Sequence, residues 1–135
     1  MPEACTFCRI VRNEEEASRV YEDENVVAFL DDRPANEGHT LVIPKEHYED
    51  IYEIPDEQIA YLFKIVKKVA QAVAESEKAD GISIVQNNGE AAHQNIFHFH
   101  VHIVPRYEGQ ESRRPREIVS QSELDLVAAK IRKHL

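Results

Sequence analysis

Residues 97–104 have the sequence FHFHVHIV, in which apolar residues and histidines alternate over the first seven positions. Successive side chains of a β-strand point to opposite faces, so a strand here places the imidazoles of His98, His100 and His102 on one face. With a rise of about 3.3 Å per residue, neighbouring imidazoles would stand roughly 6.6 Å apart and line one groove. The alternatives are an exposed polar face, which normally mixes lysine, glutamate and threonine, and a metal site built from all three rings.

Four further strands are expected from segments rich in β-branched and aromatic residues, at 19–23, 26–30, 40–43 and 82–86. The first two read as a hairpin around Glu24 and Asn25. Pro44 closes the third strand, and the Pro, Asn and Gly residues of 32–38 mark a loop. Together with the strand over 97–104, these segments predict a five-stranded sheet.

A long helix is predicted over residues 55–78, because apolar residues recur there at spacings of three and four. These residues are Ile59, Leu62, Val66, Val69 and Val73. Pro55 suits a first helical position, and Gly81 is expected to stop the helix. A short C-terminal helix is expected after Ser122, which has capping-box spacing to Asp125. The order of elements favours an α+β fold with an antiparallel sheet.

Composition narrows the class of protein. The chain has 135 residues, of which 42% are hydrophobic, enough for one core, so we expect a single domain over residues 1–135. Its net charge of −9 argues against a nucleic-acid partner held through a basic face. No apolar run approaches the roughly twenty residues that span a bilayer, and the start MPEACTFCRI lacks the pattern of a signal peptide, so we expect a cytoplasmic protein without a membrane partner.

The two cysteines, Cys5 and Cys8, are spaced as C-x-x-C. In a reducing cytosol this spacing favours metal or redox chemistry over a structural disulfide. Two thiolates form only half of a tetrahedral zinc site. The redox interpretation is weaker, because the pair does not follow a strand that opens a helix. Two buried thiols without metal are the remaining alternative.

The segment His98–Val104 resembles the H-φ-H-φ-H-φ-φ signature of the histidine triad (HIT) family, in its Hint-like branch. The resemblance extends to separated segments in the same order: Phe7–Ile10, Tyr21–Asp23, Ala28–Asp31, His39–His47, Asn87–Gly89, Gln94 and Pro105–Arg106. It implies a HIT-like fold, with a five-stranded antiparallel sheet, one long helix and a short C-terminal helix.

The resemblance implies that His100 is the nucleophile that attacks the α-phosphorus of a nucleotide. A neutral imidazole is a competent nucleophile at pH 7, and its second ring nitrogen should donate to a backbone carbonyl that fixes the tautomer. The product would be a nucleotidyl-histidine that water hydrolyses. His102 matches the residue beside the leaving group, where an imidazole can donate a hydrogen bond or a proton.

The resemblance also implies a set of nucleotide-binding residues. Asp31 matches the acid that holds the ribose hydroxyls, and Asn87 and Gln94 match amides that bind phosphate oxygens. Asn95 stands where the family often has Ser or Thr, so that contact would come from an amide instead of a hydroxyl. His39 matches a histidine behind the triad. Three apolar residues match those around the base, although composition alone would assign them to the core: Phe7, Ile10 and Phe29.

For the cysteine pair, the resemblance implies a zinc site. A zinc-containing subset of the family completes such a site with histidines that match His47 and His98. The resulting set, Cys5, Cys8, His47 and His98, has no open position, which argues for structural and not catalytic zinc.

The resemblance implies a nucleotide hydrolase that acts on purine nucleoside phosphoramidates or adenylates. The alternatives are a Fhit-like dinucleoside polyphosphate hydrolase, with which Pro105–Arg106 is compatible, and a non-catalytic nucleotide-binding or zinc-dependent interaction module. Family members of this size usually form two-fold dimers, so we expect a homodimer. Phe63 and Ile65 widen the apolar surface of the long helix and are its predicted contacts.

Overall fold

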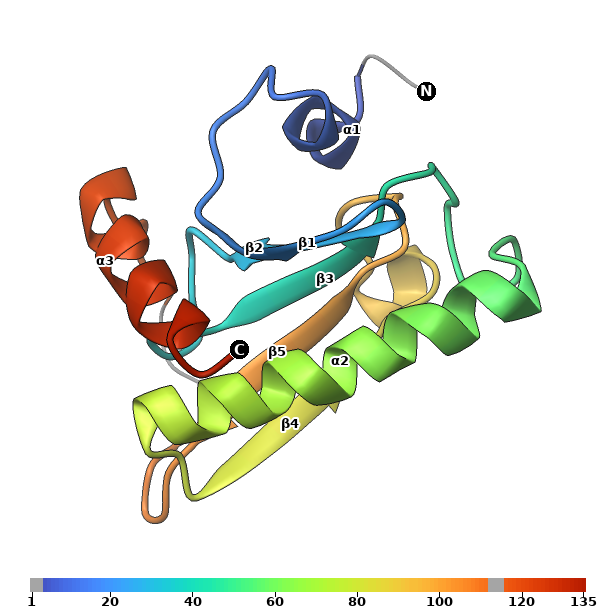
Figure 1. The fold of residues 1–135 in the computed structure, drawn as a ribbon. Coiled ribbons are helices and arrows are strands. Elements are labelled where there is room, and N and C mark those ends of the chain that lie inside the picture. Colours follow the sequence, from blue (N-terminus) through green and yellow to red (C-terminus); the bar gives the residue numbers. More distant parts are fainter. Residues whose placement is uncertain (1–3, 112–115) are drawn as a thin grey trace.

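The computed structural model describes residues 4–111 and 116–135. Its five strands form one antiparallel sheet in the order β1-β2-β3-β5-β4 (Figure 1). The strands are β1 (Arg19–Glu22), β2 (Val26–Leu30), β3 (Thr40–Pro44), β4 (Gly81–Val85) and β5 (Val101–Arg106). The helices are α1 (Thr6–Val11), α2 (Asp56–Glu77) and α3 (Gln121–Arg132), with a 3₁₀ turn, η1 (Glu90–Ala92). The predicted α+β class, sheet and two helices are confirmed.

Helices cover both faces of the sheet centre (Figure 1). Along β2, Val26, Ala28 and Leu30 pack into the core shared with α2 and α3, whereas Val27 and Phe29 pack toward α1. Because both faces of β2 are covered, all five of its residues are buried and its sequence is a continuous apolar run. The α1 face of the sheet is the face that carries the site described below.

Helix α2 buries the predicted stripe, with Ile59 partly buried and the other four residues in the core. It ends differently from the prediction. Lys78 adopts a left-handed conformation (φ 52°) and the Ala79 N–H bonds the Ala74 carbonyl, whereas Gly81 is the first residue of β4. Within the described part of the chain, no helix combines the length and the apolar character needed to cross a membrane.

The start of α3 also differs from the prediction. Ser120 caps this helix, accepting a hydrogen bond from the Glu123 N–H (3.3 Å), so the capping box begins two residues before Ser122. Helix α1 was not predicted. Its N-cap is Cys5, whose sulfur accepts the Cys8 N–H (3.4 Å). The cysteine pair therefore opens a short helix, but among the described residues no strand precedes it, so the argument against a redox pair still holds.

The strand predicted over 97–104 is shorter, since β5 begins only at Val101. Its register with β3 pairs Thr40 with Ile103, and continuing it would set Phe99 opposite Pro44, which has no N–H to pair with. Phe99 instead donates its N–H to the Tyr48 carbonyl (2.6 Å). Alternation of faces nevertheless persists beyond the strand, with Phe99 in the α2 core and the histidines on the α1 side. Phe97, which precedes β5, is 43% exposed.

Candidate active site and metal centre

A cavity of about 510 Å³ opens between α1, the sheet and the start of α3, within the usual size of small-molecule sites. Its apolar wall includes the three predicted base-contacting residues together with two others: Phe7, Ile10, Phe29, Leu41 and Ile96. Its polar lining includes Asp31, Asn95, His100, His102 and Arg116. The structure thus brings most of the predicted nucleotide-binding set to one cavity.

His100 is buried, with 5% of its surface exposed, yet it lines this cavity. Its Nδ1 lies 2.7 Å from the carbonyl oxygen of His98, which can only accept, so Nδ1 carries the proton. Burial lowers the pKa of His100 below its ordinary value, and a neutral ring then leaves Nε2 with a free lone pair. Phe7 packs edge-on against the ring, with centroids 5.1 Å apart. The site therefore holds one oriented, unprotonated imidazole nitrogen.

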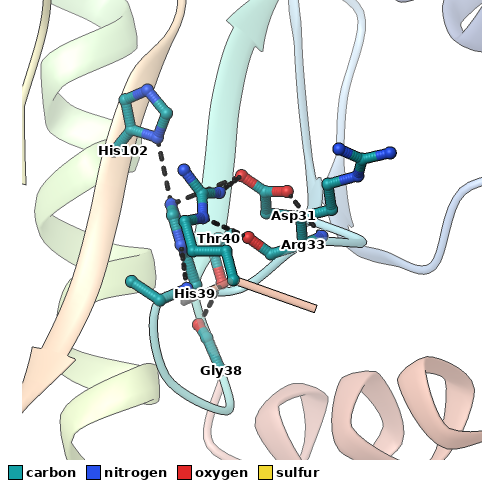
Figure 2. A network of polar contacts seen from close by, with 8 residues as sticks. Asp31, Arg33, Gly38, His39, Thr40 and His102 are labelled. Carbon is teal, nitrogen blue, oxygen red and sulfur yellow. Dashed lines mark hydrogen bonds and ion pairs between the residues drawn. The ribbon is translucent and has the colours of Figure 1, made fainter. Parts of the chain in front are cut away.

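His102 lies next to His100, with ring centroids 5.0 Å apart, and belongs to a second cluster with His39 and Asp31 (Figure 2). His102 Nδ1 is 3.0 Å from His39 Nε2, which is 3.6 Å from a carboxylate oxygen of Asp31. Burial lowers the pKa of both His39 and His102 to about 3. We call these three residues the Asp31 cluster.

Asp31 itself has two more partners. One oxygen accepts the Arg33 N–H (2.9 Å), and the other lies 2.7 Å from the guanidinium of Arg116 (Figure 2). Arg116 also donates to the Arg33 carbonyl. The sequence analysis missed Arg116, since an arginine in an irregular segment after the last strand carries no distinguishing pattern.

The amides predicted to bind phosphate are placed differently from one another. Asn95 lines the cavity. Gln94 is buried, and its amide group donates to the carbonyls of Glu49 (2.7 Å) and Ile96 (3.1 Å). Neither Gln94 nor Asn87 lines the cavity, so their roles in phosphate binding stay predictions that this arrangement does not support.

Cys5, Cys8, His47 and His98 form a compact group of four ligand atoms, all within 4.8 Å of one another. The Cys8 sulfur lies 3.3 Å from His47 Nδ1 and 3.6 Å from His98 Nδ1, and these two nitrogens are 3.2 Å apart. Tetrahedral zinc with its usual bond lengths sets sulfur and nitrogen about 3.6 Å apart and two nitrogens about 3.3 Å apart. We call these residues the cysteine cluster; its size and donor chemistry fit a zinc ion.

The ring of His98 is oriented for this purpose. Its Nε2 donates to the Pro44 carbonyl (2.8 Å), which leaves the lone pair of Nδ1 pointing into the cysteine cluster. Burial lowers the pKa of His98 to about 4, which keeps the ring neutral as metal ligation requires. Burial also raises the pKa of the Cys8 thiol to about 11, so a thiolate there needs a cation to stabilise it.

Comparisons with known proteins agree with this geometry. A family model described as HIT domain matches residues 12–109. A HIT-like protein of Methanocaldococcus jannaschii is 51% identical, over 78% of this chain and 81% of its own. The Arabidopsis thaliana protein named adenylylsulfatase HINT3 is 35% identical, over 97% of this chain and 69% of its own. The Saccharomyces cerevisiae protein named adenosine 5'-monophosphoramidase HNT1 is 40% identical, over 76% and 63%.

Solved structures are similar over nearly the whole chain. A Hit-like protein from Bartonella henselae superposes with a TM-score of 0.95 at 40% identity, covering 100% of this chain and 98% of that one. A histidine triad family protein from Mycobacterium smegmatis, solved with zinc bound, has a TM-score of 0.87 at 39% identity, covering 97% and 92%. Fold and site together define an α+β domain that joins a histidine-lined pocket to a two-cysteine, two-histidine ligand set. The chain belongs to the HIT family, as its sequence predicted.

Proposed function

We propose that this protein is a nucleotide hydrolase that cleaves at the α-phosphate of purine nucleoside phosphoramidates or adenylates. The observation that carries the proposal is the ring of His100, whose protonated Nδ1 is held by the His98 carbonyl while its other nitrogen is free at a nucleotide-sized cavity. Two relatives named adenylylsulfatase and adenosine 5'-monophosphoramidase support a substrate of this class.

In this mechanism, the base packs against the apolar wall of the cavity and Asp31 accepts hydrogen bonds from the ribose hydroxyls. His100 Nε2 uses its lone pair to form a bond to the α-phosphorus, and the bond from phosphorus to the leaving group breaks. The departing nitrogen or oxygen keeps that electron pair and takes a proton from His102. Water then attacks the phosphorus and gives one proton back to His102, while the bond from phosphorus to Nε2 breaks and its electron pair returns to His100; AMP is released and both histidines are neutral again.

The test is to trap the covalent intermediate. Brief mixing with adenosine phosphoramidate, acid quench and peptide mass spectrometry should find AMP on His100. His100→Ala should lower turnover by on the order of a thousandfold or more, because the nucleophile is lost. A control variant, His134→Ala, removes a histidine that pairs with Glu75, does not line the cavity and should leave turnover unchanged. Intact turnover in His100→Ala would sink the mechanism.

The same assay with diadenosine polyphosphates tests the Fhit-like alternative. Pro105 and Arg106, which are compatible with that alternative, lie in β5, where the Pro105 carbonyl accepts from Asn36 and Arg106 Nε donates to Ser83. Neither residue lines the cavity. The phosphoramidate or adenylate class is therefore the better supported one.

We also propose that the cysteine cluster holds a structural zinc ion. All four tetrahedral positions are supplied by the chain, so none remains for a catalytic water. The ion would join α1, through Cys5 and Cys8, to the loop after β3 and to the segment that precedes β5. It would supply a positive charge that stabilises the thiolates of buried Cys8 and partly buried Cys5, and it would not take part in cleavage.

A homodimer, with one HIT domain over residues 1–135 in each chain, is the proposed assembly. The edge strand β4 and helix α2 present an apolar surface that includes Phe63 (40% exposed) and Ile84 (44%). Ile65, predicted at this interface, is buried in the core instead, because it faces the sheet. Sedimentation should give a dimer that Ile84→Glu splits into monomers, while Tyr52→Glu, at an 87% exposed residue elsewhere, leaves it intact.

A further inference from the structure

The ring of His39 accepts a hydrogen bond from a backbone N–H on one of its sides. The backbone N–H of Ala35 points at His39 Nδ1 from 3.0 Å, so Nδ1 must be an acceptor. A neutral imidazole carries one proton, and that proton is then on Nε2. The burial that lowers the pKa of His39 to about 3 keeps the ring neutral at physiological pH. The protonation of His39 is therefore set by the backbone of its own loop.

The proton on His39 Nε2 determines the state of His102. The two rings meet at 3.0 Å through His39 Nε2 and His102 Nδ1 (Figure 2), so His39 donates and His102 Nδ1 accepts. The carboxylate of Asp31, 3.6 Å from His39 Nε2, favours a proton at that position. His102 must then carry its own proton on Nε2, which Figure 2 shows on the side of the ring away from His39.

The same contacts argue against a metal ion in the Asp31 cluster. A metal bound at His39 Nε2 would require the proton to move to Nδ1, where it would point at the Ala35 N–H. The cysteine cluster shows the opposite arrangement, since the remote nitrogen of His98 donates to a carbonyl and its near nitrogen has a free lone pair. The short distance between His39 Nε2 and His102 Nδ1 is therefore explained by a hydrogen bond between the two rings and not by a bound metal.

The loop that carries the Ala35 N–H is held firmly. The buried Asn36 side chain donates to the Pro105 carbonyl of β5 (2.7 Å) and to Gln110 (2.8 Å). Gly38 has a φ of +93°, and a Cβ there would come within 2.7 Å of the Glu77 side chain of α2. These contacts fix the direction of the Ala35 N–H relative to the strand that carries His102.

We propose that His39 is a positioning residue that holds His102 in the tautomer with its proton on Nε2, the nitrogen available to the leaving group in the cavity. This proposal rests on the proposed function, because it assigns His102 the role of proton donor during cleavage. His39 does not contact the substrate. It acts by ensuring that His102 presents a proton and not a lone pair.

The first test reads the tautomer directly and needs no turnover. Two-dimensional ¹H–¹⁵N NMR correlations of the imidazoles should show His102 with its proton on Nε2, with His102→Gln used to assign the signals. His39→Leu removes the donor and should shift His102 to the other tautomer or to a mixture. His39→Gln retains a side-chain N–H and should preserve the wild-type pattern. Thr40→Val, which removes a hydrogen bond to the Gly38 carbonyl in the same loop, is the matched control and should also preserve it.

The second test compares leaving groups. Adenosine phosphoramidate releases an amine that must be protonated, whereas a p-nitrophenyl ester of AMP releases a stable anion. His39→Leu should lower kcat about a hundredfold for the phosphoramidate and less than about fivefold for the ester, since general acid catalysis contributes a factor of this size only where a proton is needed. KM should change little for either substrate, and His39→Gln should recover most of the lost rate.

The outcomes separate the two proposals. His102 protonated on Nδ1 in the wild-type protein, or an unchanged His102 signal in His39→Leu, would overturn the role of His39. Equal loss of rate for both substrates would also overturn it, because a general loss of structure has no preference for leaving groups. A correct tautomer in a protein that cleaves neither substrate would instead refute the proposed function and leave the tautomer assignment standing.

Discussion

Two clusters of polar side chains lie on the α1 side of the sheet. They differ in the hydrogen-bond partner of the histidine ring nitrogen that points away from the cluster. In the cysteine cluster, a carbonyl accepts from the remote nitrogen of His98, so its near nitrogen offers a lone pair to a metal. In the Asp31 cluster, an amide donates to the remote nitrogen of His39, so its near nitrogen offers a proton. Ligand distances alone would allow a metal in both. The partner of the far ring nitrogen distinguishes a metal site from a proton donor.

The cysteine cluster is also connected to His100, the proposed nucleophile, through one residue. The ring of His98 belongs to the cluster, while its carbonyl oxygen accepts the His100 Nδ1–H at 2.7 Å. Any displacement of His98 therefore shifts the acceptor that orients His100. The predictions that follow test whether the clusters differ as described.

The largest expected effect comes from breaking the cysteine cluster. Cys8→Ser should abolish zinc binding and destabilise the fold by several kcal/mol, because the proposed ion would join three separate segments. His39→Gln should leave zinc content at one ion per chain. Metal analysis by mass spectrometry and urea unfolding provide the measurements. Two zinc ions per wild-type chain, with one lost in His39→Gln, would contradict the assignment of the Asp31 cluster.

A smaller effect is expected from pH. The pKa of His39 is about 3 in the folded protein and about 6.5 when unfolded, so the unfolded chain binds the extra proton first as pH falls. This contribution to stability is complete above pH 6.5 and is lost progressively below it, by about 2 kcal/mol between pH 7 and pH 5. Urea unfolding should show that His39→Gln loses about that much less than the wild type. The cysteine cluster is common to both proteins, so its own pH dependence cancels; equal losses would refute the prediction.

The smallest effect concerns Arg116, which would compete with the ribose of the proposed substrate for the Asp31 carboxylate. Because its side chain is 41% exposed, the ion pair is worth at most about 1 kcal/mol. Arg116→Ala should therefore lower KM about two- to fivefold and leave zinc content unchanged. Arg12→Ala removes the similar pair with Glu14 away from the cavity and should leave KM unchanged. Steady-state kinetics decide the matter, and a tenfold rise in KM would show that Arg116 binds the substrate.

The parts of the fold that the sequence predicted are those whose periodicity reflects burial. The α2 stripe and the alternation of histidines with apolar residues over 98–103 each follow from one repeated contact with the core. The start of β5 could not be predicted, since it depends on Pro44 in a different strand facing Phe99. Helix α1 was missed because its six residues are too short for a periodic pattern and its cap is a cysteine, which is not a usual helix start.

The candidate site was predicted unevenly for the same reason. The face shared by the three histidines follows from local alternation. The role of His47 in the cysteine cluster, and the place of the α1 residues in the cavity wall, were predicted only through the family resemblance. The proton arrangement of His39 depends on the Ala35 N–H, and Arg116 depends on where the chain returns after β5. The direction of the Ala35 N–H and the position of Arg116 depend on the tertiary structure, so the types of the neighbouring residues do not predict them.

Cys5 begins α1 by accepting the Cys8 N–H on the same sulfur that faces the metal ligands, and α1 carries Phe7 and Ile10 into the cavity wall. The proposed ion and the proposed nucleotide would therefore contact one short helix from two sides. We expect each to strengthen the binding of the other, and thermodynamic reciprocity requires the two factors to be equal. A nucleotide in the pocket should raise the affinity of the chain for its ion, so a chelator would strip the empty protein more readily than the nucleotide-bound one.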